Sequence, residues 1–517
     1  MAPSRVLKRP ACAIAQPEPA AYEATECQWQ HGSSMAEEPG WASWPQGREV
    51  PAIPWADHMI RALVTHGHLP PQASKSPTLN VWSDCSGINS EMFALKDLSR
   101  SLKRIIGADI QWSLHFICES DPKSITFAKD NHGPRHISTD MKQRNFSTGE
   151  YWCESCGQNH PLPRSGVDLY VGTYPCSPWS RRGPRTSWDH PSVEAFRIGV
   201  ETIAFAHPAV WIIEVGELPQ ESAVDEVVTA IQQACHQGGR QYTIQPIRNL
   251  TPAFAGYPIK RPRTFFLGWR ADVGSAVVVT RAAATLLQNP LDVTMSYRGF
   301  LGTMRPYDWS GVGEYLAGSM LEFATSSPCM CSCDPMVMCP LHPCKCGRCG
   351  ADGLACAWRK LCTDQLAHSG MAATERKTVG KGTYLQALES QGGTGPQQQR
   401  ARVLLNMFAV DPRHQPLKDT LALIDTSQNP PFGSYPTDGL APTLTTTSQL
   451  WCLSAGRFLE SWELAALMGL DTRTFKLKSH SDAWFRKRLG LAVSVPNFGL
   501  ALMAAMAAPL RRVLDGQ

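Results

Sequence analysis

Four short apolar runs along the chain are each bounded by glycine, proline or a polar residue. They cover residues 79–83, 115–118, 167–171 and 208–213. Short runs of aliphatic and β-branched residues with such boundaries predict buried strands. In an open α/β sheet, the loops after the carboxyl ends of the strands hold the chemistry. We therefore expect the functional residues directly after these runs.

A glycine turn and a helix are predicted after the first strand. Residues 86–90 read Ser-Gly-Ile-Asn-Ser, and a helical stretch follows from about residue 91 to residue 100. This arrangement places backbone N–H groups around an anionic or polar ligand. Glu119 ends the second strand, where a carboxylate can accept hydrogen bonds from both hydroxyls of a ribose. These residues alone favour no single adenosine cofactor.

Cys176 follows the third run in a Pro-Cys-Ser-Pro turn, and Arg181, Arg182 and Arg185 come directly after it. Neighbouring cations favour the thiolate, which is the form of cysteine that attacks an electrophile. Glu214 ends the fourth run. The alternatives are a small buried cysteine and a glutamate that caps a helix or lies on the surface.

Two arginines, Arg261 and Arg263, stand at the start of a further apolar run. Alternate side chains of a strand share one face, so we expect both guanidinium groups to project together. Their forked donors suit a phosphate or a carbonyl oxygen. The alternative is a solvated pair of surface charges.

In this order the segments resemble the motifs of the C5-cytosine-specific DNA methyltransferase family, over about residues 78–270 and 436–510. Cys176 stands at the position of the family's nucleophile, and Glu214 at the glutamate of its Glu-Asn-Val motif. The resemblance implies an α/β, Rossmann-like, S-adenosylmethionine-dependent methyltransferase fold, with a mixed sheet and helices on both sides. A smaller target-recognition region carrying a Cys-rich zinc module is expected to split this fold.

The implied reaction is methyl transfer from S-adenosylmethionine to carbon 5 of cytosine in double-stranded DNA. The Cys176 thiolate adds to carbon 6, the Glu214 carboxylic acid assists at ring nitrogen 3, and Arg261 with Arg263 anchors base and backbone. The target base must leave the duplex, because the thiolate cannot reach carbon 6 within the stack. The resemblance assigns the following residues to the cofactor: Cys85, Ser86, Gly87, Ile88, Glu119, Ser120, Asp140, Met141, Pro175, Ala492 and Val493.

Several positions depart from the family's motifs. Ser83 stands where an acid is common, and Asn89 where a second glycine is expected; the others are Cys85, Val215, Ile259 and Leu491. These departures keep open a nucleic-acid-binding chromatin protein with impaired catalysis, although the presence of Cys176 and Glu214 speaks against it. A cytosine-5 methyltransferase acting on transfer RNA is the other alternative, and the long recognition region favours DNA.

Half of the 18 cysteines fall in one segment. Without a signal peptide, this density favours zinc thiolate sites over disulfides. Two zinc ions in tetrahedral shells would use eight ligands. The predicted zinc ligands are Cys329, Cys331, Cys333, Cys339, Cys344, Cys346, Cys349, Cys356 and Cys362.

A second candidate metal site lies between the second and third apolar runs. Cys153 and Cys156 form a C-x-x-C pair, and His160 follows them. Three ligands leave a tetrahedral zinc shell incomplete, so the site needs a fourth group from elsewhere in the chain. A plain loop is the alternative.

The remaining sequence sets the expected domain organisation. We expect a disordered leader over residues 1–76, the catalytic domain in two parts over 77–275 and 436–517, and the recognition region over 276–435. The apolar stretch 489–510 is long enough for a membrane span, but its proline and its place in the motif series predict a buried core helix. We expect no membrane association, and a nuclear location if the source is eukaryotic, otherwise an intracellular one.

Composition adds one constraint on binding partners. The net charge of +4 does not by itself indicate a nucleic-acid-binding protein. A local patch can still bind phosphate, and the arginines after Cys176, together with Arg261 and Arg263, supply one.

Overall fold

The computed structural model describes a defined set of segments. These are residues 53–175, 190–218, 221–239, 241–274, 276–291, 423–427, 440–452, 457–471, 474–477 and 480–515. Cys176, the three arginines after it and the predicted zinc ligands Cys329 to Cys362 lie outside the described residues, as does most of the predicted leader.

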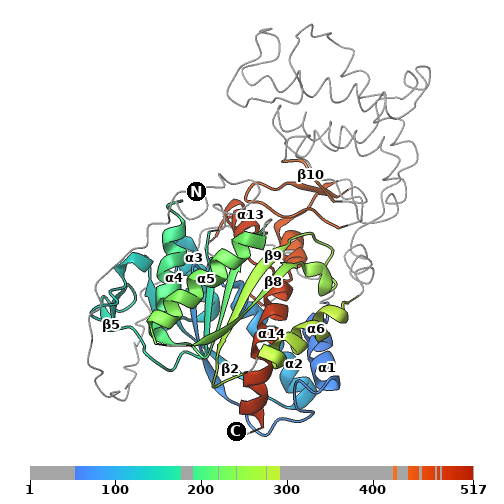
Figure 1. Cartoon of the computed structure of the whole chain (residues 1–517). Helices are drawn as coiled ribbons and strands as arrows, with labels where there is room; N and C mark the ends of the chain where they lie inside the picture. The colour runs from blue at the N-terminus through green and yellow to red at the C-terminus, as the bar shows by residue number, and fades with distance from the viewer. Residues whose placement is uncertain are drawn as a thin grey trace, which may run out of the picture. The chain divides into compact units, whose positions relative to one another are not determined.

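A seven-stranded sheet forms the centre of the fold, in the order β3-β2-β1-β6-β7-β9-β8 (Figure 1). Strands β3, β2, β1, β6 and β7 are parallel neighbours, whereas β9 runs antiparallel to both β7 and β8. The mixed sheet predicted from the sequence is confirmed. The strands are β1 (Thr78–Asp84), β2 (Gln111–Cys118), β3 (His136–Ser138), β6 (Leu169–Thr173), β7 (Val210–Val215), β8 (Tyr242–Leu250) and β9 (Arg263–Arg270).

The central strands are apolar on both faces because helices cover both sides of the sheet. Along β7, Val210 and Ile212 join one hydrophobic core, while Trp211 and Ile213 join the other. Successive side chains of a strand point to opposite faces, so an unbroken apolar run fills two cores at once. This explains why the four apolar runs coincide with β1, β2, β6 and β7.

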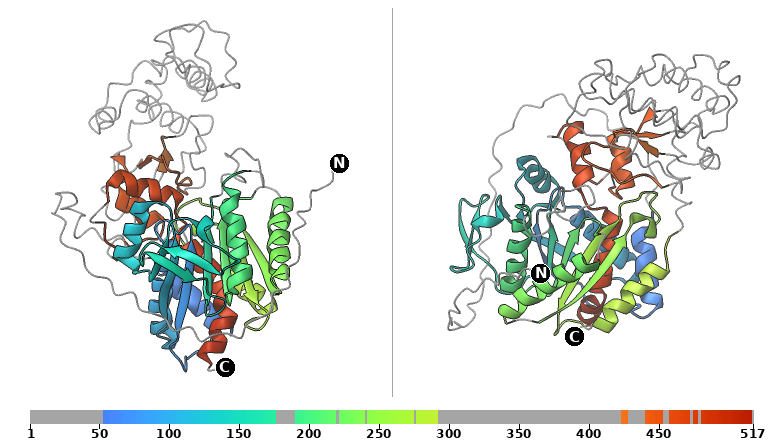
Figure 2. Two further views of the ribbon diagram at one scale, coloured as in Figure 1. Left: turned by 90° about the vertical axis from the view of Figure 1, so that its left-hand side faces the viewer. Right: turned by 45° about the horizontal axis from the view of Figure 1, so that its top comes forward.

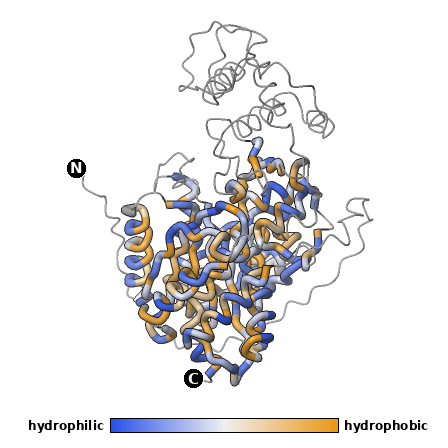
Figure 3. Tube along the Cα trace, turned by 90° about the vertical axis from the view of Figure 1, so that its right-hand side faces the viewer, coloured by the Kyte–Doolittle hydropathy of each residue, from blue (hydrophilic) through white to orange (hydrophobic). Residues whose placement is uncertain are grey.

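Different helices cover the two faces (Figure 2). One core contains side chains from α1 (Trp55–Thr65), α2 (Ser90–Ile106), α3 (Pro122–His132), α6 (Ala276–Gln288) and α14 (Val495–Leu514). The other core contains side chains from α4 (Val193–Ala206) and α5 (Glu221–Gln237). Apolar positions concentrate inside these layers and polar positions on the outer helix faces (Figure 3).

The apolar tail forms the buried helix that the sequence predicts. The stretch Asp482–Leu514 is long and apolar enough to cross a membrane, but 89% of its apolar window is buried inside the protein. α14 packs against α2 and α6 on the same side of the sheet. Gly499 is required at one contact, because a Cβ there would lie 2.2 Å from the ring of Trp55. The tail is therefore a core element of this domain.

The carboxyl-terminal segments place smaller elements beside the sheet. Strands β10 (Leu423–Asp425), β11 (Leu450–Cys452) and β12 (Arg457–Phe458) form a small antiparallel sheet. The short helix α12 (Ser461–Leu467) follows, and the side chains of Glu460 and Glu463 close a capping box at its start. Helix α13 (Asp482–Leu491) precedes α14.

One insertion interrupts the alternation of strand and helix. Between β3 and β6 the chain forms a hairpin of β4 (Glu150–Cys153) and β5 (Gln158–Pro161). The backbone N–H of Glu154 donates to the carbonyl of Ile137 in β3 at 2.8 Å, so the hairpin is attached to the edge strand of the main sheet.

Candidate active site

A pocket of about 450 Å³ lies at the carboxyl ends of β1, β2, β6 and β7. This volume falls within the range of small-molecule and cofactor sites. Every residue that the motif resemblance assigns to the cofactor lines the pocket, from Cys85 in the first loop to Val493 before α14. The cavity therefore lies where functional residues are expected in an open α/β sheet, directly after the carboxyl ends of the strands.

The loop after β1 adopts left-handed backbone at three positions. Cys85, Gly87 and Asn89 have φ values of 55°, 53° and 53°. Asparagine enters this region more readily than most residues with a side chain. Asn89 therefore keeps the turn geometry although it stands where the family has a second glycine. The start of α2 consequently faces the pocket, and Ser90 contributes to its wall.

Glu119 connects β2 to this loop. Its Oε2 accepts a hydrogen bond from the Gly87 N–H at 2.7 Å, and its Oε1 accepts one from the Asp121 N–H at 2.9 Å. Backbone donors thus fix the orientation of the carboxylate, which is 8% exposed, at the pocket wall. A fixed acceptor in this place suits the hydroxyls of a ribose.

Asp140 and Met141 form the next part of the wall. The Oδ1 atom of Asp140 accepts from the Lys142 N–H at 2.9 Å and starts the short 3₁₀ helix η1 (Met141–Gln143). The sulfur of Met141 lies 3.9 Å from the Cys85 Sγ. Two soft, polarisable side chains therefore lie next to each other at this wall of the pocket.

Glu91 is a pocket residue that the sequence analysis missed. Its carboxyl group is buried, and Oε1 accepts from the Ser83 hydroxyl at 2.6 Å and from the Asn89 Nδ2 at 2.9 Å. Burial raises the pKa of Glu91. Two departures from the family motif, Ser83 and Asn89, thus bind one carboxyl group that α2 supplies. An acid in the first turn after a glycine loop was the available signal.

A buried ion pair lies beneath the pocket. Arg144 Nη1 donates to the Asp84 Oδ2 at 2.7 Å and to the Thr202 hydroxyl at 2.8 Å, and both charged side chains are fully buried. The Tyr170 hydroxyl donates to the same Asp84 oxygen and contacts the Tyr174 hydroxyl at 2.5 Å. The end of β1 is therefore linked to the loop that leads to Cys176.

Two glycines fix the position of Tyr174. A Cβ at Gly172 would lie 2.5 Å from the Tyr174 ring, and one at Gly199 would lie 1.7 Å from its hydroxyl oxygen. Tyr174 and Pro175 both line the pocket. Because Pro175 directly precedes Cys176, the described chain enters the predicted nucleophile turn at the pocket wall.

Glu214 and Arg263 form an ion pair at the same pocket. Arg263 Nε lies 2.8 Å from the Glu214 Oε1, and the two side chains are 14% and 8% exposed. Burial raises the pKa of the Glu214 carboxyl, while Arg263 and Arg261 act in the opposite direction, and the net shift is upward. A carboxyl group with this property can hold a proton for a bound ligand.

Arg261 does not line the pocket, which differs from the expectation for this residue. Its guanidinium is fully buried and donates to the carbonyl oxygens of Leu444 at 2.7 Å and Gly490 at 3.0 Å, and also to that of Ala492. β9 begins only at Arg263, so the alternation of a strand does not apply to Arg261. This arginine instead joins the segment around Leu444 to the segment that contains Gly490 and Ala492.

Asn131, near the end of α3, bonds to the carboxyl-terminal part of the chain. The Asn131 Nδ2 donates to the Lys476 carbonyl at 3.1 Å, and its Oδ1 accepts from the Lys476 N–H at 2.6 Å. Asn131 therefore holds the carboxyl-terminal segment next to α3. Leu491 at the end of α13 and the next two residues, Ala492 and Val493, line the pocket.

The fold and the pocket define the class: a Rossmann-like methyltransferase fold with a nucleoside-sized cavity at the carboxyl ends of the parallel strands. Residues 106–297 match the family described as C-5 cytosine-specific DNA methylase. The resemblance drawn from the motifs is confirmed over these residues.

Solved structures are similar to the chain at low identity. A protein encoded within an E. coli prophage, named for a DNA modification methyltransferase, shares 14% identity over 85% of this chain and 100% of that chain, with a TM-score of 0.43. S. pombe Dnmt2 shares 13% identity over 83% of this chain and 98% of that chain, with a TM-score of 0.40. The Entamoeba histolytica methyltransferase EhMeth shares 11% identity over 83% of this chain and 98% of that chain, with a TM-score of 0.41. No curated protein matches the chain. Likeness at these TM-scores adds nothing to the family match.

Proposed function

We propose that this protein transfers a methyl group from S-adenosylmethionine to carbon 5 of cytosine in DNA. One observation carries the proposal: the buried acid Glu214, the residues assigned to the cofactor and Pro175, which directly precedes Cys176, line one pocket. Sites that methylate this carbon need an acid, a nucleophile and a methyl donor around a single base.

S-adenosylmethionine fits the residues of this pocket. Glu119 would accept hydrogen bonds from the ribose, and Asp140 would accept one from the adenine amino group. The loop from Cys85 to Ile88 would lie against the amino-acid part, with the N-terminus of α2 behind it. When bound, this cofactor supplies an electrophilic methyl group on its sulfonium.

The protein's part of the reaction concerns the cytosine ring. The Cys176 thiolate forms a bond to carbon 6, and Glu214 gives a proton or a strong hydrogen bond to ring nitrogen 3, which takes up the developing negative charge. Carbon 5 thereby becomes enamine-like and nucleophilic, and it would take the methyl group from the sulfonium, whose sulfur would keep the bonding electron pair as a neutral thioether. A base then removes the carbon 5 proton, the bond between Cys176 and carbon 6 breaks, and ring nitrogen 3 returns its proton to Glu214, which restores the aromatic ring, the thiolate and the acid.

The raised pKa of Glu214 supports this role. A carboxyl group that ionised freely would be charged when the base arrives, and it could then only accept a hydrogen bond. Burial favours the neutral form of Glu214, which can donate. Arg263 remains next to the acid and can bind the pyrimidine carbonyl oxygen or a phosphate.

Methyl transfer from labelled S-adenosylmethionine to duplex DNA and to transfer RNA tests the proposal. We expect incorporation into cytosine of the duplex and none into transfer RNA, and no incorporation with Cys176→Ala. The matched control is Glu201→Gln, because this exposed carboxylate on α4 does not line the pocket. Labelling of transfer RNA alone would assign the RNA substrate and refute the proposal, and absence of labelling on both substrates would refute catalysis.

A further inference from the structure

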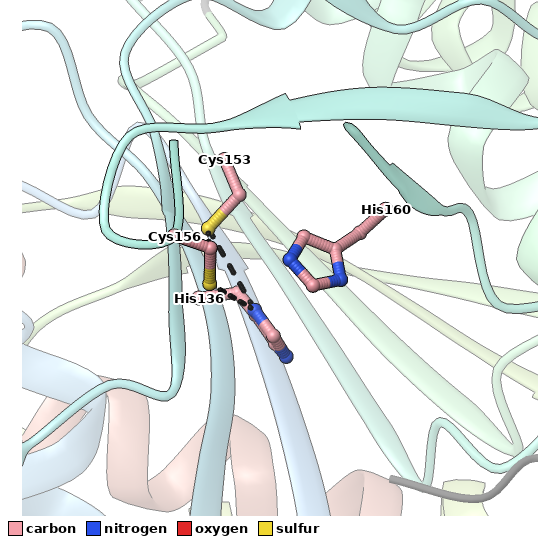
Figure 4. A group of neighbouring side chains, drawn as sticks. All are labelled: His136, Cys153, Cys156 and His160. Atoms are coloured by element: carbon pink, nitrogen blue, oxygen red, sulfur yellow. Dashed lines mark hydrogen bonds between the residues drawn. The ribbon is translucent and has the colours of Figure 1, made fainter. Parts of the chain in front are cut away.

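The hairpin between β3 and β6 brings together four side chains typical of metal ligands (Figure 4). They are His136 at the start of β3, Cys153 at the end of β4, Cys156 in the turn and His160 in β5. Cys153 and His160 come from the paired strands of the hairpin, whereas His136 comes from the edge of the main sheet. The structure thus supplies a fourth ligand to the C-x-x-C pair and His160.

The distances between these atoms match the edges of a coordination tetrahedron. The Sγ atoms of Cys153 and Cys156 are 3.4 Å apart, and His136 Nδ1 lies 3.7 Å and 3.5 Å from them. With Zn–S of about 2.3 Å and Zn–N of about 2.0–2.1 Å, a tetrahedral shell has S···S edges of roughly 3.8 Å and S···N edges of roughly 3.6 Å. One ligand atom from each of the four residues lies within 4.8 Å of all the others.

Hydrogen bonding alone accounts poorly for this geometry. A single ring nitrogen, His136 Nδ1, lies at nearly equal distance from two sulfurs, but it can carry either one proton or one lone pair. It can therefore bond well to only one thiol at a time. A cation at the centre would interact with all four groups at once. Cys153, His136 and His160 are also buried, which protects such a site from solvent.

The backbone is already arranged for a C-x-x-C metal turn. The Gly157 N–H donates to the Cys153 carbonyl at 2.9 Å, and Gly157 has a φ of 65°, which closes the turn directly after Cys156. Beyond the turn, β4 pairs with β5 so that Tyr151 lies opposite His160. The register of the hairpin thus positions Cys153 and His160, and its turn positions Cys156.

We propose that His136, Cys153, Cys156 and His160 bind a structural zinc ion. Two thiolates and two imidazoles in a tetrahedral arrangement suit zinc, and four protein ligands leave no open position for catalysis. The site is separate from the cysteine-rich segment Cys329 to Cys362, and it does not depend on the methyl-transfer proposal.

The position of the site indicates what the zinc ion would stabilise. It would fasten the hairpin to β3, and the chain continues from β3 through Thr139 to the pocket residue Asp140. The Thr139 hydroxyl also lies 3.3 Å from the Glu154 Oε1 in the hairpin. Loss of the ion would therefore destabilise the hairpin first and then the part of the pocket around Asp140, where the adenine is expected.

Zinc content of the full-length chain tests the site. We expect the double variant Cys153→Ala/Cys156→Ala to contain about one zinc ion per chain less than the wild type, as measured by mass spectrometry of the metal. The matched control is Cys235→Ala, since Cys235 is buried as Cys153 is but lies in α5 outside the group. Its zinc content should equal that of the wild type. Equal zinc content in the double variant and the control would overturn the proposal.

Hydrogen exchange on the unmutated protein keeps the test independent of how well the variant folds. After removal of zinc with a chelator, we expect the rate of amide exchange to increase more in residues 149–162 than in α5. Unchanged exchange in this hairpin would contradict the site, and so would a disulfide between Cys153 and Cys156 in the purified, unreduced protein.

Discussion

Arg263 Nε lies 2.8 Å from the Glu214 Oε1, and both side chains border the pocket that the cofactor residues line. β7 and β9 are antiparallel neighbours, and Glu214 pairs with Phe265, two residues beyond Arg263. The sheet therefore fixes the acid and the cation relative to each other. Burial raises the pKa of the acid in spite of the cation, so the pair contains a carboxyl group that can be protonated.

The pH dependence of methyl transfer should report this carboxyl group. If Glu214 acts as an acid, the single-turnover rate falls as the pH rises through its raised pKa, because the donating form is lost. Glu214→Gln should lower the rate by about 10²- to 10⁴-fold and abolish this descending limb. Arg263→Gln should move the limb to higher pH, since it removes a cation that favours the carboxylate. An unchanged profile in Glu214→Gln would exclude the role.

Arg261 and Arg263 should give opposite results although they are separated by one residue. Arg261→Met removes the donor to three carbonyl oxygens, that of Leu444 being buried, and should lower the free energy of unfolding by roughly 2–5 kcal/mol. Arg263→Met should change stability little and reduce methyl transfer strongly. Urea unfolding and the transfer assay together separate the two effects. Stability equal to wild type in Arg261→Met would contradict the structural role.

Glu119→Gln should weaken binding of S-adenosylmethionine. The substitution replaces a carboxylate that accepts from Gly87 and is placed to accept from a ribose. Loss of a hydrogen bond to a charged group costs about 1.5–3 kcal/mol, which corresponds to about 10- to 100-fold in the dissociation constant. Calorimetric titration measures it, with Glu201→Gln as the charge-matched control. Equal affinity in the two variants would remove Glu119 from the cofactor site.

Gly199→Ala tests the packing that holds Tyr174. Replacing glycine by alanine within a helix normally stabilises it by roughly 1 kcal/mol. Here the new methyl group would meet the Tyr174 hydroxyl, so we expect a loss of about 1–3 kcal/mol instead. In the Tyr174→Leu variant, Gly199→Ala should lower the free energy of unfolding much less. Equal losses in both backgrounds, measured by thermal unfolding, would show that the contact with Tyr174 is not responsible.

Much of the site could be predicted because the sheet is buried on both faces. Apolar runs then mark β1, β2, β6 and β7 directly, and the parallel order brings the residues after them to one edge. Glu119 and Glu214 follow from that rule alone, whereas Asp140 is assigned only by the resemblance to the family's motifs. Asn89 shows the limit of comparing motifs by residue identity. It stands where the family has a glycine, but its backbone adopts the left-handed conformation that the turn requires.

Three features could not be predicted, each for a physical reason. The environment of Arg261 depends on where β9 begins, and strand ends are poorly defined by local sequence. Glu91 looks like an ordinary charge at the start of a helix until its burial is known. His136 joins Cys153 and Cys156 only because β3 and the hairpin are neighbours in space, which no spacing in the sequence encodes.

The central claim is that Cys176 attacks carbon 6 of a cytosine held in this pocket. The most direct measurement is covalent trapping, in which the protein is mixed with a duplex containing 5-fluorocytosine in the presence of S-adenosylmethionine. Fluorine at carbon 5 cannot be removed as a proton is, so the adduct accumulates. The predicted result is a stable protein–DNA adduct that needs the cofactor and disappears in Cys176→Ser. Absence of an adduct with the intact protein, or its persistence in Cys176→Ser, would contradict the account.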